Sequence, residues 1–109
     1  MRTRQQAAQT LMALPELKAW SVMIEKKSAG KTHGAVVEYD PAPRVVKGKR
    51  YWQLSFVENG AEAAERWESF LVSASDDEIL VEDGATDELL SLKRWRKEYR
   101  PMERGNESN

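Results

Sequence analysis

The stretch Arg50-Tyr51-Trp52-Gln53-Leu54-Ser55-Phe56-Val57-Glu58 decides the fold class of this 109-residue chain. Its apolar and polar side chains alternate with the period of two that is typical of a strand with one buried face. Similar runs at Arg66–Ala74 and Glu78–Glu82 follow the polar loop Asn59-Gly60 and the turn Ser75-Asp76-Asp77. Because these connections are short, the three strands are predicted to form an antiparallel meander.

The alternation also sorts the aromatic side chains between the two faces of the sheet. Trp52 and Phe56 are assigned to the buried core together with Phe70 of the second strand. Tyr51 and Trp67 fall on the opposite face. There they are either covered by a helix or exposed as anchors of an interface, because aromatic residues are enriched at interfaces. Both alternatives stay open for these two residues.

Helical patterns precede and follow the strands. Thr3 and Gln6 have the spacing of a capping box at the start of a first helix, which Pro15 ends. Glu16–Ser28 is predicted as a second helix, because Pro and Glu suit its first turn and apolar residues recur at helical spacing. A strand is the alternative for this segment. A short C-terminal helix is predicted from about Ser91.

The predicted fold class is therefore α+β, with N-terminal helices packed on a three- or four-stranded antiparallel sheet and a short C-terminal helix. Ala35–Tyr39 is predicted as a further short strand. It should end at Asp40-Pro41-Ala42-Pro43, because proline has no backbone N–H for a sheet. Residues 1–100 are expected to form one domain. Residues 101–109, with Met102 as their last apolar side chain, are expected to form a flexible tail.

Acidic residues are concentrated in the middle of the chain. Residues 58–88 hold eleven acidic side chains against Arg66 alone, whereas residues 1–57 hold ten basic and four acidic ones. We expect this acidic block to face a basic cleft on a protein partner; a merely solvated face is the alternative. The residues predicted to contact the partner are Glu62, Glu65, Asp76, Asp77, Glu78, Glu82 and Asp83, with Tyr51 and Trp67.

The sequence contains none of the common catalytic or metal-binding patterns. It has no Cys, and His33 is its only histidine, so a zinc site built from these residues is excluded. Ala29-Gly30-Lys31-Thr32 is similar to the end of a P-loop, but Glu25 stands where that motif needs its first Gly. The carboxylates at the turn 76–78 share one solvated environment, unlike an acid and base pair. We therefore expect no enzymatic activity, no catalytic residue, no metal and no cofactor.

Nucleic acid and membranes are not expected as partners. Lys93-Arg94-Trp95-Arg96-Lys97 could contact phosphate, but the acidic block would repel it, and pairing of this basic helix with the acidic sheet edge is favoured instead. No window approaches the roughly 18 apolar residues of a membrane span. The lack of Cys suits a reducing compartment, so a cytoplasmic location is expected, or a periplasmic one if a leader has been removed.

Two resemblances to known families add functional hypotheses. The order of helix, proline, strand Tyr51–Phe56 and hairpin Ser69–Val81 resembles the PepSY family, over roughly residues 3–83. The chain departs from that family at Asp77, where Gly is common, and by its added segment at residues 92–99. This resemblance implies a binding module that regulates a peptidase.

The second resemblance is to the small immunity proteins encoded beside secreted bacterial toxins, including type VI secretion effectors. It lies in size and in lopsided charge, and it implies a non-enzymatic inhibitor that binds and blocks a cognate toxin. This inhibitor is our leading hypothesis. The peptidase-regulating module and a small nucleic-acid-binding protein are the alternatives.

Overall fold

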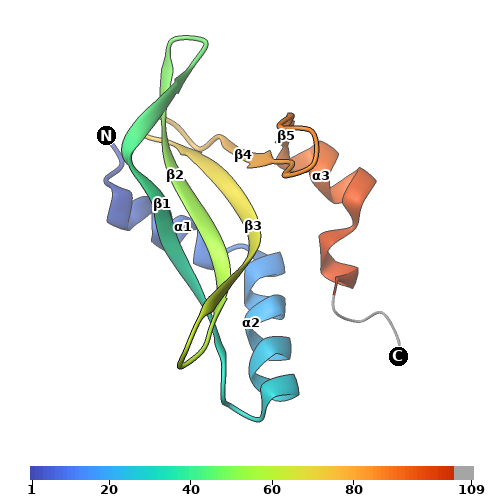
Figure 1. The fold of residues 1–109 in the computed structure, drawn as a ribbon. Coiled ribbons are helices and arrows are strands. Elements are labelled where there is room, and N and C mark those ends of the chain that lie inside the picture. The colour runs from blue at the N-terminus through green and yellow to red at the C-terminus, as the bar shows by residue number, and fades with distance from the viewer. Residues whose placement is uncertain (105–109) are drawn as a thin grey trace.

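A five-stranded antiparallel sheet forms the centre of the computed structural model, which describes residues 1–104. Each strand pairs with the next along the chain, and the β1–β2 hairpin extends beyond the other strands (Figure 1). The predicted α+β meander is confirmed, with five strands where three or four were expected. The strands are β1 (His33–Val46), β2 (Lys49–Asn59), β3 (Ala64–Ser73), β4 (Ile79–Glu82) and β5 (Leu89–Ser91).

Three α-helices pack against one face of this sheet: α1 (Arg4–Met12), α2 (Pro15–Ser28) and α3 (Leu92–Tyr99). The predicted capping box starts α1, and the helix expected at residues 16–28 is confirmed as α2, so the strand alternative is wrong. Ser91 caps α3 at the predicted place, because its hydroxyl accepts the backbone N–H of Arg94. None of the helices within residues 1–104 is long and apolar enough to cross a membrane.

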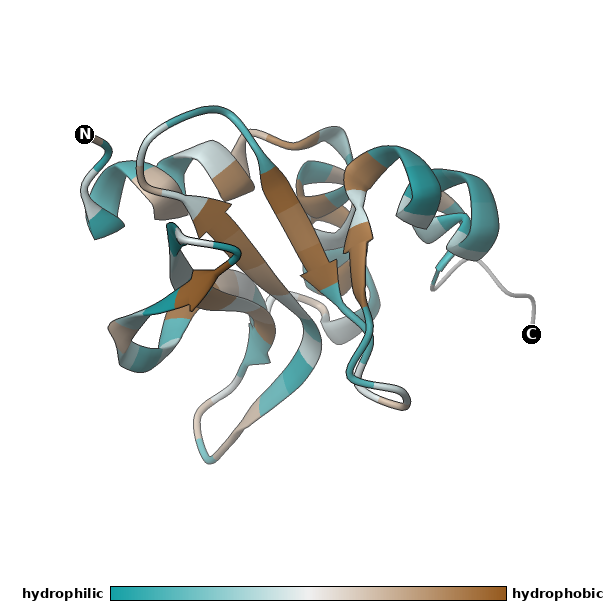
Figure 2. Cartoon of the chain, turned by 90° about the horizontal axis from the view of Figure 1, so that it is seen from above, coloured by the Kyte–Doolittle hydropathy of each residue, from teal (hydrophilic) through white to brown (hydrophobic). Residues whose placement is uncertain are grey.

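The core lies between the helices and the sheet. Phe56 and Phe70 from the central strands are fully buried there, as predicted, against Trp20 of α2 and Trp95 of α3. Trp52 is half-buried at the rim of the same cluster. Figure 2 shows the strands hydrophobic along the middle of the sheet, whereas α3 is hydrophilic over most of its surface. The covered face of the sheet therefore holds the main hydrophobic core.

β1 approaches α2 closely at Gly34. A Cβ atom added there would lie 2.6 Å from the ring of Phe56 and 2.6 Å from Oγ of Ser21. Such separations are well inside van der Waals contact, so only glycine fits without movement of its neighbours. The hydroxyl of Ser21 is buried at this contact and has no hydrogen-bond partner within residues 1–104. The close approach therefore fixes α2 against the edge of the sheet.

A bulge changes the face on which Trp67 lies. Phe56 pairs with Glu68 and Val57 pairs with Arg66, which leaves Trp67 as an extra residue in β3. A bulge interrupts the alternation of faces, so Trp67 points to the helix-covered side. Its ring centroid lies 5.4 Å from that of Trp20. The prediction that Trp67 lies on the opposite face with Tyr51 is therefore wrong.

β1 continues through its prolines, so the prediction that this strand ends at Tyr39 is also wrong. Its pairing with β2 shifts between Glu38 and Asp40 and again between Asp40 and Arg44, and residues 41–43 have no partner in the ladder. β1 is an edge strand, where proline is tolerated because the missing N–H faces no neighbouring strand. The prolines therefore interrupt the pairing without ending the strand.

The chain beyond α3 returns to the core. Pro101 is buried within a short 3₁₀-helix, Pro101–Glu103, and its carbonyl accepts the indole N–H of Trp20 at 2.8 Å. Arg104 donates to the carbonyl of Trp67 at 2.7 Å. The predicted start of a flexible tail at Pro101 is therefore wrong. The remainder of that predicted tail, residues 105–109, lies outside the described residues.

Candidate functional site

The face of the sheet opposite the helices, here called the helix-free face, carries both apolar and polar side chains. The strand register places Gln53, Leu71 and Leu80 side by side across β2, β3 and β4 on this face. Leu71 is fully buried although all three α-helices lie on the other side. Leu80 and Leu89 are only half-buried, so they leave some apolar surface open on this face.

A shallow groove of about 390 Å³ lies on the helix-free face between the β1–β2 hairpin and β5. Tyr51 contributes to its lining but is itself buried, with 3% of its surface exposed, and it donates its hydroxyl to Glu78 at 2.6 Å. Lys49 closes one side, and its ammonium lies 2.7 Å from the same carboxylate. The site thus combines an apolar floor with a fixed polar rim. We call it the apolar groove, and its apolar lining residues are Val46, Tyr51, Leu80 and Leu89.

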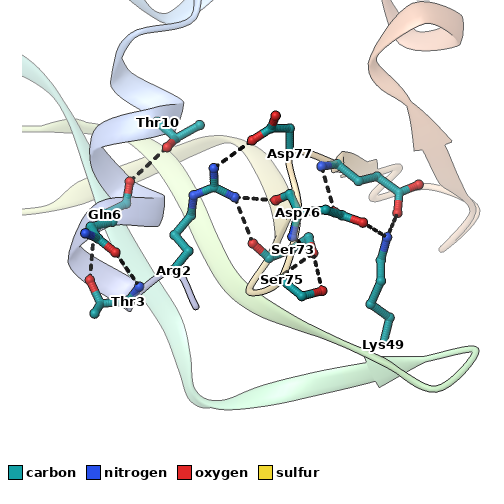
Figure 3. A network of polar contacts seen from close by, with 10 residues as sticks. Arg2, Thr3, Gln6, Thr10, Lys49, Ser73, Ser75, Asp76 and Asp77 are labelled. Atoms are coloured by element: carbon teal, nitrogen blue, oxygen red, sulfur yellow. Dashed lines mark hydrogen bonds and ion pairs between the residues drawn. The ribbon is translucent and has the colours of Figure 1, made fainter.

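The acidic turn between β3 and β4 is held by two basic side chains (Figure 3). Lys49 lies 2.7 Å from Asp76, and Arg2 lies 3.0 Å from Asp77. Arg2 also donates to the backbone carbonyl of Ser73 at 3.1 Å. The hydrogen bond from Lys49, followed by that from the backbone N–H of Glu78, lowers the pKa of Asp76 to about 2. The predicted contact residues at this turn are therefore fixed in place and largely neutralised within the chain.

A second polar network lies across the middle of the helix-free face. Glu82 of β4 accepts hydrogen bonds from Tyr39 at 2.8 Å and from Arg44 at 3.2 Å. Both donors belong to β1, so the contact passes over β2 and β3. The guanidinium of Arg66 lies 5.7 Å from the ring centre of Tyr39. Burial, and then the hydrogen bond to Glu82, raise the pKa of Tyr39 to about 12.

The predicted contact residues do not form one continuous surface. Glu62 and Glu65 lie where β2 turns into β3, whereas Asp76 lies beyond the other end of β3. The ten residues of β3 span about 33 Å at a rise of roughly 3.3 Å each, so the two groups are far apart. Asp83 follows β4, where it accepts the hydroxyl of Tyr99. Only Tyr51, Glu78 and their neighbours at the turn come together at the apolar groove.

The basic C-terminal helix pairs within the chain, and in part with the acidic sheet edge, as expected, because Glu88 directly precedes the edge strand β5. Arg94 lies 2.7 Å from Glu88 and 2.9 Å from Glu98. Arg96 donates at 2.6 and 3.1 Å to Glu16, which is buried at the first turn of α2. These contacts support the expected intramolecular pairing of basic side chains. They also join α3 to α2 on the covered side of the sheet.

The sequence analysis missed several residues of the helix-free face, among them Tyr39, Arg44, Val46, Leu80 and Leu89. The alternation in β4 pointed to Leu80, because it lies one residue from the core residue Ile79. Leu89 belongs to a strand of three residues, which is too short for a periodic signal. Tyr39 and Arg44 contact Glu82 across a long stretch of sequence, so no local sequence pattern predicts this contact.

The chain matches no protein-family model, no curated protein sequence and no solved structure. Within residues 1–104, no three carboxylate or imidazole groups gather as a metal site would require.

Proposed function

We propose that this protein is a non-enzymatic inhibitor, of the immunity type, that binds a protein partner through its helix-free face. The observation that carries the proposal is the apolar groove around Tyr51, on a sheet face with no helix among residues 1–104 to cover it. When a partner side chain covers such a groove, the free energy of the complex falls, because apolar surface is removed from water. The groove thereby offers an anchor point for the partner.

The polar side chains around the groove favour protein binding for a second reason. Tyr51 is held by Glu78, and Tyr39 and Arg44 are held by Glu82. Tyrosine and arginine dominate the energetics of many protein interfaces. Because these side chains are already ordered by hydrogen bonds, binding of a partner would cost less side-chain conformational entropy. The helix-free face is thus prepared for contact before a partner arrives.

The charges define what the partner should present. Lys49 offsets Asp76 and Glu78, so this end of the face offers hydrogen-bond acceptors more than a strong negative field. Glu78 lines the groove itself, and its side chain is 43% exposed. We therefore propose a partner segment with an apolar residue for the groove and a neighbouring basic residue for Glu78. A toxin that acts on nucleic acid has basic residues near its active site.

The proposal is tested with the product of the neighbouring gene, co-expressed with the chain. We expect the double substitution Leu80→Arg and Leu89→Arg to weaken capture of that product at least about tenfold, because two charges would be buried in the apolar groove. The same variant should fail to neutralise its toxicity. Capture and neutralisation by the double variant at the wild-type level would overturn the proposal.

A matched control separates a lost interface from a lost fold. Val22 lies on the outer side of α2 and is 69% exposed, so Val22→Arg adds one arginine away from the groove, to be compared with each single groove variant, Leu80→Arg and Leu89→Arg. This control should bind as the wild type does, and circular dichroism should show all variants folded. If the neighbouring gene encodes a peptidase that the chain activates, the chain is a peptidase-regulating module and not an immunity protein.

A further inference from the structure

A second site lies on the covered side of the sheet, where α2, β3 and the C-terminal segment meet. A cleft of about 530 Å³ opens there, and Trp20, Glu68 and Arg104 contribute to its lining. Trp67, the residue displaced by the bulge, packs on Trp20 beside it. We call the group formed by Trp20, Trp67 and Glu68 the tryptophan cage. It lies on the opposite side of the sheet from the apolar groove.

The guanidinium of Arg104 occupies the tryptophan cage. Its central carbon lies 4.7 Å from the ring centre of Trp67 and 5.5 Å from that of Trp20. One of its nitrogens donates to the carbonyl of Trp67 at 2.7 Å and lies 3.9 Å from the carboxylate of Glu68. Two indole faces, a carbonyl and a carboxylate are the groups that recognise a planar, charged guanidinium.

Glu68 gives the site a carboxylate that is partly withdrawn from water. Its side chain is only 19% exposed, and burial, which disfavours the charged form, raises its pKa, whereas the indole of Trp95 and the guanidinium of Arg104 act to lower it. The indole N–H of Trp95 donates to it at 3.2 Å. A buried carboxylate destabilises the fold unless a cation or hydrogen bonds compensate it. At 3.9 Å, Arg104 is at the outer limit of an ion pair, so the carboxylate can accept a closer cation.

Arg104 is also placed where another group can displace it. Its side chain is 41% exposed, and the neighbouring Arg100 and Glu103 are largely exposed as well. The contact that anchors this segment is made by Pro101, through its carbonyl and Trp20. The guanidinium of Arg104 can therefore leave the cage while Pro101 stays in place.

We propose that the tryptophan cage is an arginine-recognition site, which Arg104 fills in the unbound protein and an arginine side chain of a protein partner takes over. The cage and the apolar groove lie on opposite faces of the sheet. Loss of one leaves the other intact, and the binding of a small arginine derivative tests the cage without any partner protein.

The test uses N-acetyl-L-arginine methylamide as the probe and tryptophan fluorescence of the full chain as the signal. Arg104→Ala vacates the cage, so we expect it to bind the probe at least about tenfold more tightly than the wild type, whose own Arg104 competes at high effective concentration. N-acetyl-L-lysine methylamide should bind Arg104→Ala several-fold more weakly, because an ammonium cannot stack or form a planar fork.

Arg4→Ala is the matched control, since the guanidinium of Arg4 also lies over an indole, 5.7 Å from the ring centre of Trp52, but Arg4 does not line the cleft. It should bind the probe no better than the wild type. Arg104→Lys provides a second test that keeps the positive charge. We expect this variant to bind the arginine probe more tightly than the wild type does, because the probe displaces a lysine from the cage more easily than an arginine. Equal probe affinity in the wild type, Arg104→Ala and Arg104→Lys would overturn the proposal, as would equal binding of the lysine probe.

Discussion

The two faces of the sheet reach similar burial by different means. On the covered face, Phe56 and Phe70 are buried by whole helices that dock through Trp20 and Trp95. On the helix-free face, Leu71 is buried just as fully, while Tyr39 and Arg44 of β1 reach over to Glu82. Helix docking excludes water over a wide area, whereas single side chains leave the groove beside them open. One face therefore provides most of the stability, and the other is the face that we propose for binding.

The largest expected effect separates the two faces directly. Phe56→Ala should lower the free energy of unfolding by about 3 to 5 kcal/mol, because it leaves a cavity among fully buried aromatic rings. Leu80→Ala in the apolar groove should cost less than about 1.5 kcal/mol, since Leu80 is only half-buried. Urea denaturation measures both. Equal losses would mean that the groove belongs to the folding core and not to a binding face.

An intermediate effect is expected where β1 meets the covered face. Gly34→Ala should lower the free energy of unfolding by about 1 to 3 kcal/mol, because the new methyl group overlaps the ring of Phe56 and the hydroxyl of Ser21. Gly84→Ala is the control, since no atom lies within 4 Å of a Cβ added at Gly84. A thermal melt in which both variants match the wild type would show that β1 does not press on α2.

The smallest effect concerns the helix-free face and appears only at high pH. The pKa of Tyr39 rises from 10.0 to about 12 on folding, so the folded chain retains a proton that the unfolded chain loses in this range. The corresponding stability is complete below pH 10 and is lost as the pH rises toward about 12. Tyr39→Phe should flatten this part of the curve of urea midpoint against pH. An unchanged slope in Tyr39→Phe would assign the titration to another group.

The strands and helices could be predicted because their signals are local. Alternation over residues 50–58 identified β2, and Thr3 with Gln6 identified the start of α1. The face of Trp67 could not be predicted, since a bulge is a property of two paired strands and reverses the alternation beyond it. Pro41 and Pro43 led to the same kind of error in β1, because the edge position that tolerates them is set by the whole sheet.

The candidate sites were predictable only in part, for the same reason. Tyr51 and Glu78 were identified from sequence and meet at the apolar groove. The charge count also identified an acidic block, but it did not reveal that Lys49 and Arg2 fold back onto the turn. The tryptophan cage depends on Arg104, which follows the last helix and was assigned to a tail. Contacts between residues this far apart in sequence appear only after the chain has folded.

The prolines of β1 also bear on how the protein behaves at high concentration. An edge strand offers unpaired backbone groups to which a strand of another molecule can add, which is a common start of aggregation. Pro41 and Pro43 lie on this edge, in the part of β1 that is unpaired with β2. They have no N–H to donate to an added strand, so pairing along this edge would be interrupted between Tyr39 and Arg44. The prolines therefore oppose the addition of a long strand along the β1 edge.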